Sequence, residues 1–122
     1  MRFAAKTDIG KLREVNEDCY AIITDCPGIT AAFLVADGMG GHNSGEVASR
    51  VAVDEIRTAL KTRLSAVTDD EEKDLSKLVE ELIIAANRVV YSKAEQREED
   101  HGMGTTIIVA VIADRVMHIG HV

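Results

Sequence analysis

The sequence has few aromatic residues, and this restricts what its core can be made of. Aromatic residues occupy 3% of the 122 positions, tryptophan is absent, and there is one proline. The core must therefore consist mainly of valine, isoleucine, leucine and alanine, in a chain that is 46% hydrophobic. This composition is typical of a globular protein, and the length suits one domain at most.

Basic residues are also in the minority. The chain has 14 lysines and arginines against 21 acidic residues, which gives a formal net charge of −7. Nucleic-acid-binding proteins present basic surfaces, so this balance argues against a nucleic-acid partner. No apolar run approaches the length of a membrane span, and no apolar signal region follows Met1. We therefore expect a cytoplasmic protein without a membrane partner.

Only two cysteines are present, Cys19 and Cys26. If the segment between them is extended, at about 3.3 Å per residue, they are too far apart for a disulfide. Reduced thiols, as in a cytosolic protein, are the simpler interpretation.

The first third of the chain predicts strands. They cover residues 3–9, 19–24 and 30–36, and the Pro27-Gly28 pair predicts a hairpin between the last two. The segment 30–36 is a nearly continuous apolar run, which is typical of a strand covered on both faces.

The middle of the chain predicts two amphipathic helices. The first begins at a cap provided by Asn43 or Ser44 and runs to about Leu64, and a polar, acidic linker over residues 65–71 follows it. Its apolar stripe consists of Ala48, Val51, Ala52, Ile56, Ala59 and Leu60. The buried face of the second helix consists of Leu75, Leu78, Val79, Leu82, Ile83, Ala86 and Val90.

The last third returns to strand. Gly102 and Gly104 interrupt the helical pattern after the acidic run 98–100, which we interpret as a solvated helix end. Residues 105–113 are rich in β-branched side chains, and residues 116–122 follow a tight turn as a hairpin partner. The order predicts an α+β fold with the helices packed on an antiparallel sheet.

The run Leu-Val-Ala-Asp-Gly-Met-Gly-Gly-His over residues 34–42 carries the clearest chemical signal. It places Asp37 at the end of an apolar strand, immediately before a glycine-rich turn. A rigidly held carboxylate suits a hard cation, and glycines let a ligand approach the backbone. Glu17 and Asp18 supply two further carboxylates, and Arg13 offers a guanidinium fork that matches phosphate.

These blocks together resemble the bacterial metal-dependent serine/threonine phosphatases of type 2C, the PPM family. The resemblance rests on their order and spacing along the whole chain, and it implies that the α+β fold is part of an antiparallel β-sandwich flanked by two long antiparallel helices. The blocks are Thr7-Asp8-Ile9-Gly10, Arg13, Asn16-Glu17-Asp18, residues 35–42, residues 45–49, residues 102–106 and residues 118–122.

The resemblance implies a role for each matched position. Asp37 would bridge two Mn²⁺ or Mg²⁺ ions, and the Gly38 carbonyl would complete one coordination sphere. Glu17 and Asp18 would act at the second metal, largely through bound water, and Arg13 would hold the substrate phosphate. The implied reaction is hydrolysis of phosphoserine and phosphothreonine in a phosphorylated protein, with water activated by the metal pair.

The sequence departs from the family pattern in two respects. The family strand that matches residues 116–122 continues into Gly-Asp-Ser-Arg, and two further metal-binding aspartates follow it; none of these motifs lies within residues 1–122. We therefore expect residues 1–122 to be the N-terminal portion of one catalytic domain, truncated at its C-terminal end and without full activity. Met39 replaces the proton-donating histidine of eukaryotic members, and His42 receives no role.

Two alternatives from other functional classes remain open. One is a non-catalytic fragment that self-associates through an exposed sheet edge. The other is a nucleotide-binding loop at Gly38-Met39-Gly40-Gly41, although Asn43 stands where the third fingerprint glycine belongs. His118 and His121 do not form a metal pair, because positions three apart on a strand point to opposite faces.

Overall fold

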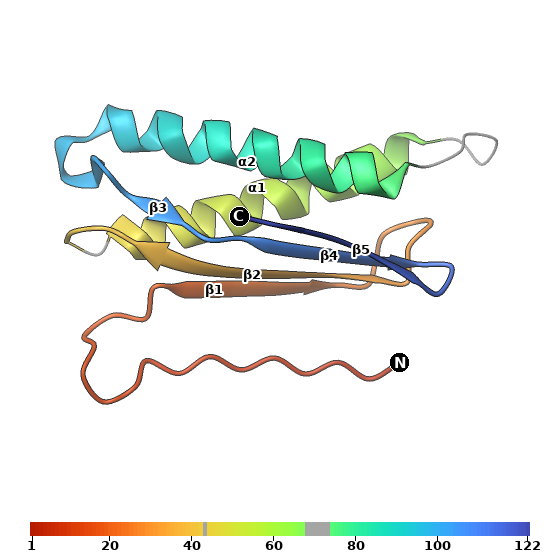
Figure 1. The fold of residues 1–122 in the computed structure, drawn as a ribbon, viewed down its shortest axis with the longest axis horizontal. Helices are drawn as coiled ribbons and strands as arrows, with labels where there is room; N and C mark the ends of the chain where they lie inside the picture. Colours follow the sequence, from red (N-terminus) through yellow and green to blue (C-terminus); the bar gives the residue numbers. More distant parts are fainter. Residues whose placement is uncertain (43, 68–73) are drawn as a thin grey trace.

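Two long helices lie on one face of an antiparallel sheet in the computed structural model (Figure 1). The structure describes residues 1–42, 44–67 and 74–122. The predicted cap at Asn43 and most of the predicted linker over residues 65–71 lie outside the described residues. Within them, the arrangement is the predicted α+β fold.

The sheet has the strand order β1-β2-β4-β5, with every neighbouring pair antiparallel. The strands are β1 (Asp18–Ile23), β2 (Ala31–Met39), β4 (Ile108–Ala113) and β5 (Val116–His121). A two-residue strand, β3 (Gly104–Thr105), pairs with the end of β2. The predicted hairpin between the second and third predicted strands is confirmed as β1–β2. Strand β2 is therefore central, and β1 and β5 are the edges.

The helices are α1 (Ser44–Ala66) and α2 (Leu75–Gln96), followed by the short 3₁₀ helix η1 (Glu98–Asp100). Asp74 caps α2 by accepting a hydrogen bond from the backbone N–H of Lys77 at 2.9 Å. Neither α1 nor α2 combines the length and the apolar character that a membrane span requires.

The predicted apolar stripes of both helices face the sheet. The largest side chains that are fully buried between helices and sheet are Leu34, Ile56, Leu60, Leu64, Leu82, Val53, Val109 and Val111. Most of the predicted stripe positions are buried, while Val51, Ala59 and Ile83 are half-buried at its margin. The 3.6-residue period therefore located the buried helix faces correctly.

The prediction that the strand over residues 30–36, now β2, is covered on both faces was wrong. Leu34 and Ala36 are buried beneath α1, but Val35 between them is 51% exposed. Because side chains alternate along a strand and the helices cover one face, every second residue of β2 points to the opposite, outer face. This outer face of the sheet carries the exposed apolar residues Tyr20, Ile22, Val35, Ile108, Met117 and Ile119.

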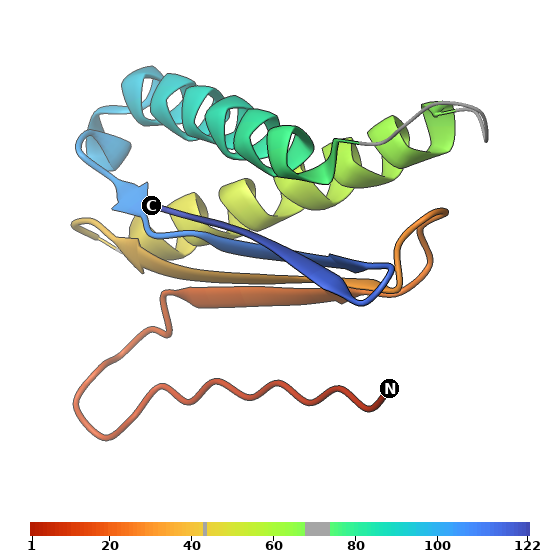
Figure 2. The same cartoon turned by 45° about the vertical axis from the view of Figure 1, so that its right-hand side comes forward.

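The predicted strand over residues 3–9 is also corrected by the structure. The segment is extended but belongs to no strand, because it crosses the outer face instead of lying beside a sheet edge (Figures 1 and 2). We call residues 1–9 the N-terminal arm. The Phe3 ring packs edge-on against Phe33 of β2, with ring centroids 5.1 Å apart.

The single strand predicted over residues 105–113 is divided into β3 and β4. The break falls at Thr106, whose hydroxyl accepts a hydrogen bond from the Asp37 backbone N–H at 3.1 Å. The Thr106 backbone N–H donates to the Asp37 carbonyl at 2.9 Å. The Thr106 hydroxyl thus takes the place of a backbone carbonyl in the pairing with β2, and the strand is interrupted at this residue.

We expect the two faces of β2 to differ in their contribution to stability. Leu34→Ala should lower the free energy of unfolding by about 3 kcal/mol, because it leaves a cavity in the core. Val35→Ala, one residue away on the outer face, should cost less than about 1 kcal/mol. Urea denaturation followed by circular dichroism measures both, and equal losses would contradict the one-sided core.

Candidate functional site

Two aspartates lie opposite each other on neighbouring strands. Asp18 of β1 is the cross-strand partner of Asp37 of β2, and both are exposed. Their side chains share the outer face, because Asp37 alternates with the buried residues Ala36 and Gly38. The structure thus brings together Asp18 and Asp37, which the sequence analysis had proposed as metal ligands from two separate motifs.

The backbone around this pair brings the two side chains close. Both backbone groups of Asp37 are used on the side away from β1, where they bond to Thr106. The next pair, Gly38 and Glu17, shares a hydrogen bond of 3.1 Å from the Gly38 N–H to the Glu17 carbonyl. Asp18 and Asp37 therefore form a non-hydrogen-bonded pair, the type in which facing side chains are closest.

A cleft of about 520 Å³ separates the N-terminal arm from the strands at this point. Its lining includes both aspartates and the cationic residue Lys6. The complete lining is Ala4, Ala5, Lys6, Thr7, Asp18, Cys19, Tyr20, Val35, Ala36 and Asp37. The arm therefore forms one wall of the cleft that contains the two carboxylates.

Asp18 is held by residues to which the sequence analysis gave no individual role. The Thr7 hydroxyl donates to Asp18 Oδ2 at 2.8 Å, and the Asn16 side-chain amide donates to Thr7 Oγ1 at 3.0 Å. The Asp18 backbone N–H donates to Asn16 Oδ1 at 3.0 Å. Both residues lie within motif blocks already quoted, and that position was the one sequence signal that could have identified them.

Glu17 points away from the aspartate pair. Its carboxylate lies against α1, where a side chain at Gly45 would come within 2.7 Å of it. Arg13 Nη1 contacts Glu17 Oε2 at 3.4 Å, and the Arg13 side chain is 74% exposed. Among the described residues, no group of three His, Cys, Asp or Glu side chains is arranged to hold a metal ion. The roles inferred for Glu17 and Arg13 stay predictions.

Gly38 is required by packing as well as by any ligand. A Cβ built on Gly38 would lie 1.9 Å from the Gly45 carbonyl oxygen of α1 and 2.9 Å from the Glu17 carbonyl oxygen. The end of β2 and the start of α1 therefore approach closely only because both positions are glycine. The contact with Gly45 therefore fixes the position of Gly38, the residue directly after Asp37.

The two histidines of β5 are arranged as predicted. His118 faces α2, where its Nδ1 lies 2.9 Å from the Ser76 hydroxyl oxygen, whereas His121 is exposed. The interpretation of residues 98–100 as a solvated helix end was wrong for Asp100. That side chain is buried and accepts a hydrogen bond from the Ser44 hydroxyl at 2.8 Å, which joins η1 to the start of α1.

Both cysteines are free thiols. Burial raises the pKa of Cys19, and the charge of Asp54 raises it further. Burial likewise raises the pKa of Cys26, with a second contribution from Asp25. A raised pKa leaves a smaller fraction of either thiol as the nucleophilic thiolate.

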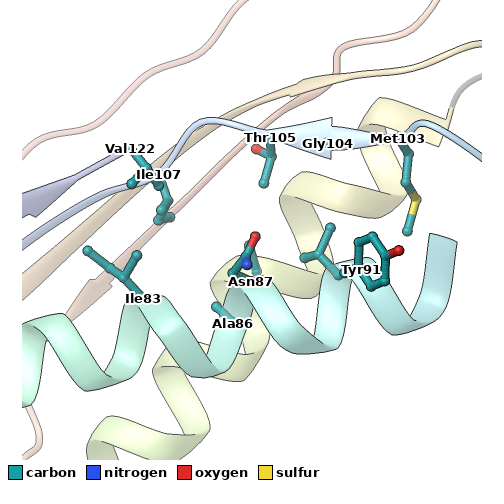
Figure 3. Close-up of a pocket in the computed structure, with 11 residues that line it drawn as sticks. Ile83, Ala86, Asn87, Tyr91, Met103, Gly104, Thr105, Ile107 and Val122 are labelled. Atoms are coloured by element: carbon teal, nitrogen blue, oxygen red, sulfur yellow. The ribbon is translucent and has the colours of Figure 1, made fainter.

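A second, mostly apolar pocket of about 150 Å³ lies between α2 and the strand segments that follow it (Figure 3). Asn87 and Tyr91 of α2 line it, together with Thr105 and the C-terminal residue Val122. The close-up shows Tyr91 beside Met103. The pocket contains none of the carboxylates discussed above.

Comparison with known proteins identifies the family. The family model described as protein phosphatase 2C matches residues 12–122, nearly the whole chain. The chain belongs to the protein phosphatase 2C family. The resemblance to this family is thereby confirmed. The strand-glycine-helix unit of a nucleotide-binding fold is not supported, because all strand pairs in the described sheet are antiparallel.

Individual relatives agree with this membership. The serine/threonine phosphatase stp of Listeria monocytogenes is 35% identical over 96% of this chain. The crystal structure of the Mycobacterium tuberculosis serine/threonine phosphatase PstP/Ppp covers 99% of this chain at 30% identity, with a TM-score of 0.78. A structure of the PstP catalytic domain in complex with two manganese ions covers 99% at 31% identity, with a TM-score of 0.75.

The chain spans less than half of each of these proteins. It covers 45% of the Listeria protein, 46% of the first PstP structure and 47% of the manganese complex. Family membership and the shared fold are therefore established for this half, while the activity of the whole relatives is a separate question.

The contact between Gly38 and Gly45 can be tested by substitution. Gly38→Ala should lower the free energy of unfolding by about 3 kcal/mol, because the added methyl group collides with rigid backbone. Gly41→Ala is the matched control, since nothing lies within 4 Å of a Cβ at that position. Thermal unfolding of both variants would reveal the difference, and a fully stable Gly38 variant would show that β2 and α1 lie farther apart.

Proposed function

We propose that this chain supplies part of the metal-binding site of a phosphatase that hydrolyses phosphoserine and phosphothreonine in proteins. The observation that supports the proposal most directly is the cross-strand pair of Asp18 and Asp37 in one cleft. Membership of the protein phosphatase 2C family supplies the reaction class. The phosphorylated protein partner and the cytoplasmic location stay predictions.

The aspartate pair fits a divalent cation. Like charges directly opposite each other destabilise a sheet, so a cation between Asp18 and Asp37 would offset an unfavourable interaction. Carboxylate oxygens are also the donors that Mg²⁺ and Mn²⁺ prefer. The Gly38 carbonyl would be a further oxygen donor, as the family resemblance implies.

When bound, the metal pair would lower the pKa of water and offset charge on the phosphoryl oxygens. The residues of this chain would serve that chemistry from two sides. Asp18 and Asp37 would hold the cations at the outer face. Arg13, which is largely exposed and contacts Glu17 at 3.4 Å, would be available to bind phosphate.

The remaining ligands would come from outside residues 1–122. The Gly-Asp-Ser-Arg motif and the two later aspartates are absent from this sequence, and the relatives are about twice as long as the region they share with it. We therefore propose weak metal binding and little turnover for these 122 residues alone. The alternative is a non-catalytic fragment that self-associates through an exposed sheet edge, such as β1 or β5, and it stays a prediction.

Asp37 provides the first test. Asp37→Asn should abolish Mn²⁺ binding, measured by electron paramagnetic resonance of free Mn²⁺, and any Mn²⁺-dependent hydrolysis of p-nitrophenyl phosphate. Without metal, the variant should be slightly more stable, by up to about 1 kcal/mol, because the repulsion from Asp18 is removed. Asp54→Asn, on the exposed side of α1, is the control. Unchanged Mn²⁺ affinity in the Asp37 variant would refute the assignment.

Arg13 provides an independent test on the phosphate side. Arg13→Ala should weaken phosphate binding by about 10-fold or more through loss of charge-assisted hydrogen bonds. It should leave stability nearly unchanged, because exposed ion pairs contribute little. Arg50→Ala removes a comparable ion pair to Glu46, four residues away on α1, and controls for loss of charge. Phosphate titration by ³¹P NMR in Mn²⁺ would decide, and equal behaviour of the two variants would exclude Arg13 as the phosphate ligand.

A further inference from the structure

The N-terminal arm is attached to the outer face at two points. Near its start, the Phe3 ring contacts Phe33 of β2. Near its end, the Thr7 hydroxyl contacts Asp18 of β1. Between these points the arm lines the cleft that contains Asp37. Its backbone runs along the side of the sheet that faces away from the helices (Figures 1 and 2).

A tight turn returns the chain from the arm towards β1. Gly10 has a φ of +74°, a conformation that favours glycine, and its N–H donates to Asp8 Oδ1 at 2.8 Å. This turn directly follows Thr7. The turn formed by Asp8 and Gly10 therefore helps to fix the position of Thr7, the residue directly before it.

The direction of each hydrogen bond around Thr7 can be deduced. The Asp18 backbone N–H can only donate, so the Asn16 atom that it contacts must be the amide oxygen. The Asn16 nitrogen is consequently the atom that faces Thr7, and it must donate to the hydroxyl. The hydroxyl then has its single proton left for the Asp18 carboxylate at 2.8 Å. The three residues form one closed and consistently directed network.

We propose that Thr7, supported by Asn16, is a positioning residue that fixes the Asp18 carboxylate for a divalent cation shared with Asp37. The inference rests on the proposed function and assigns a role to the N-terminal arm within it. Thr7 occupies Oδ2 of Asp18, and a carboxylate has acceptor capacity on both oxygens, so the group retains capacity for a metal. Thr7 itself is not a metal ligand in this arrangement.

The physical reason is the freedom of an exposed carboxylate. Asp18 lies on an edge strand with its side chain in solvent, where several rotamers are accessible. A directed hydrogen bond to one oxygen restricts that freedom before the metal arrives. Outer partners of metal ligands typically change metal affinity by about 10- to 100-fold when they are removed.

The test compares side chains that differ only in the hydroxyl group. Thr7→Val should weaken Mn²⁺ binding by about 10-fold or more, whereas Thr7→Ser should restore it to within about 3-fold of the original chain. Thr24→Val, in the exposed segment beyond the opposite end of β1, should leave the affinity unchanged. Titration followed by electron paramagnetic resonance of free Mn²⁺ gives all four dissociation constants.

A double-mutant cycle shows whether Thr7 acts through Asp18. In the Asp18→Asn background, Thr7→Val should cause no further loss of Mn²⁺ affinity. Independent, multiplying losses would overturn the inference, because they would mean that Thr7 supports the cleft by another route. The same cycle with Phe3→Ala separates simple attachment of the arm from positioning of Asp18.

A metal-free measurement completes the test. Thr7→Val should shift the side-chain amide resonance of Asn16 in ¹⁵N NMR spectra and speed its hydrogen exchange, since that amide loses its acceptor. An unaffected resonance would overturn the network. If Asp37→Asn abolishes Mn²⁺ binding and Thr7→Val does not change it, the inference fails and the proposed function stands. If the original chain binds no Mn²⁺, or Asp37→Asn binds it equally well, the proposed function fails first.

Discussion

The alternating burial of β2 is the constraint on which the site depends. Leu34 and Ala36 pack beneath α1, and Gly38 meets the backbone of Gly45. Because alternate residues of a strand face opposite ways, anchoring these three positions forces Asp37 outward. The core and the candidate metal ligand are therefore two consequences of one register. A slip of one residue would bury the carboxylate and expose the core.

Local patterns predicted the elements well where one element's own sequence decided its structure. The helices and the β1–β2 hairpin were found because periodicity and the Pro27-Gly28 turn are local signals. Which face of the sheet the helices cover is not decided by the sequence of any one strand. Val35 and Ile108 are as apolar as core residues, so composition could not show which face the helices leave open. The N-terminal arm was predicted to be a strand for the same reason. An extended segment becomes a strand only when it pairs with the edge of another strand, and its own sequence does not show whether such a partner is available.

The candidate site divides in the same way. Residue type and motif order identified Asp18 and Asp37, while their pairing follows from the register of two strands. Glu17 directly precedes β1, and its orientation opposite to Asp18 follows from the alternation of neighbouring residues in an extended chain, which the sequence could have predicted. The hydrogen-bond network around Thr7 could not be predicted, since it joins a residue of the N-terminal arm to a loop residue nine positions away and to a residue of β1 eleven positions away. The strand break at Thr106 could not be predicted either, because it depends on a hydrogen bond from the Asp37 backbone N–H to the Thr106 side chain.

The position of β2 at the centre of the sheet has a consequence for how the chain folds. One of its neighbours, β1, is adjacent in sequence, but the other, β4, lies beyond both helices. Closing so long a loop is entropically costly, and folds rich in such pairings form slowly. During synthesis, the first hairpin and α1 emerge well before β4, so the apolar edge of β2 must wait without its partner. The central strand β2 therefore keeps one edge unpaired until β4 has emerged, although its other edge already pairs with β1.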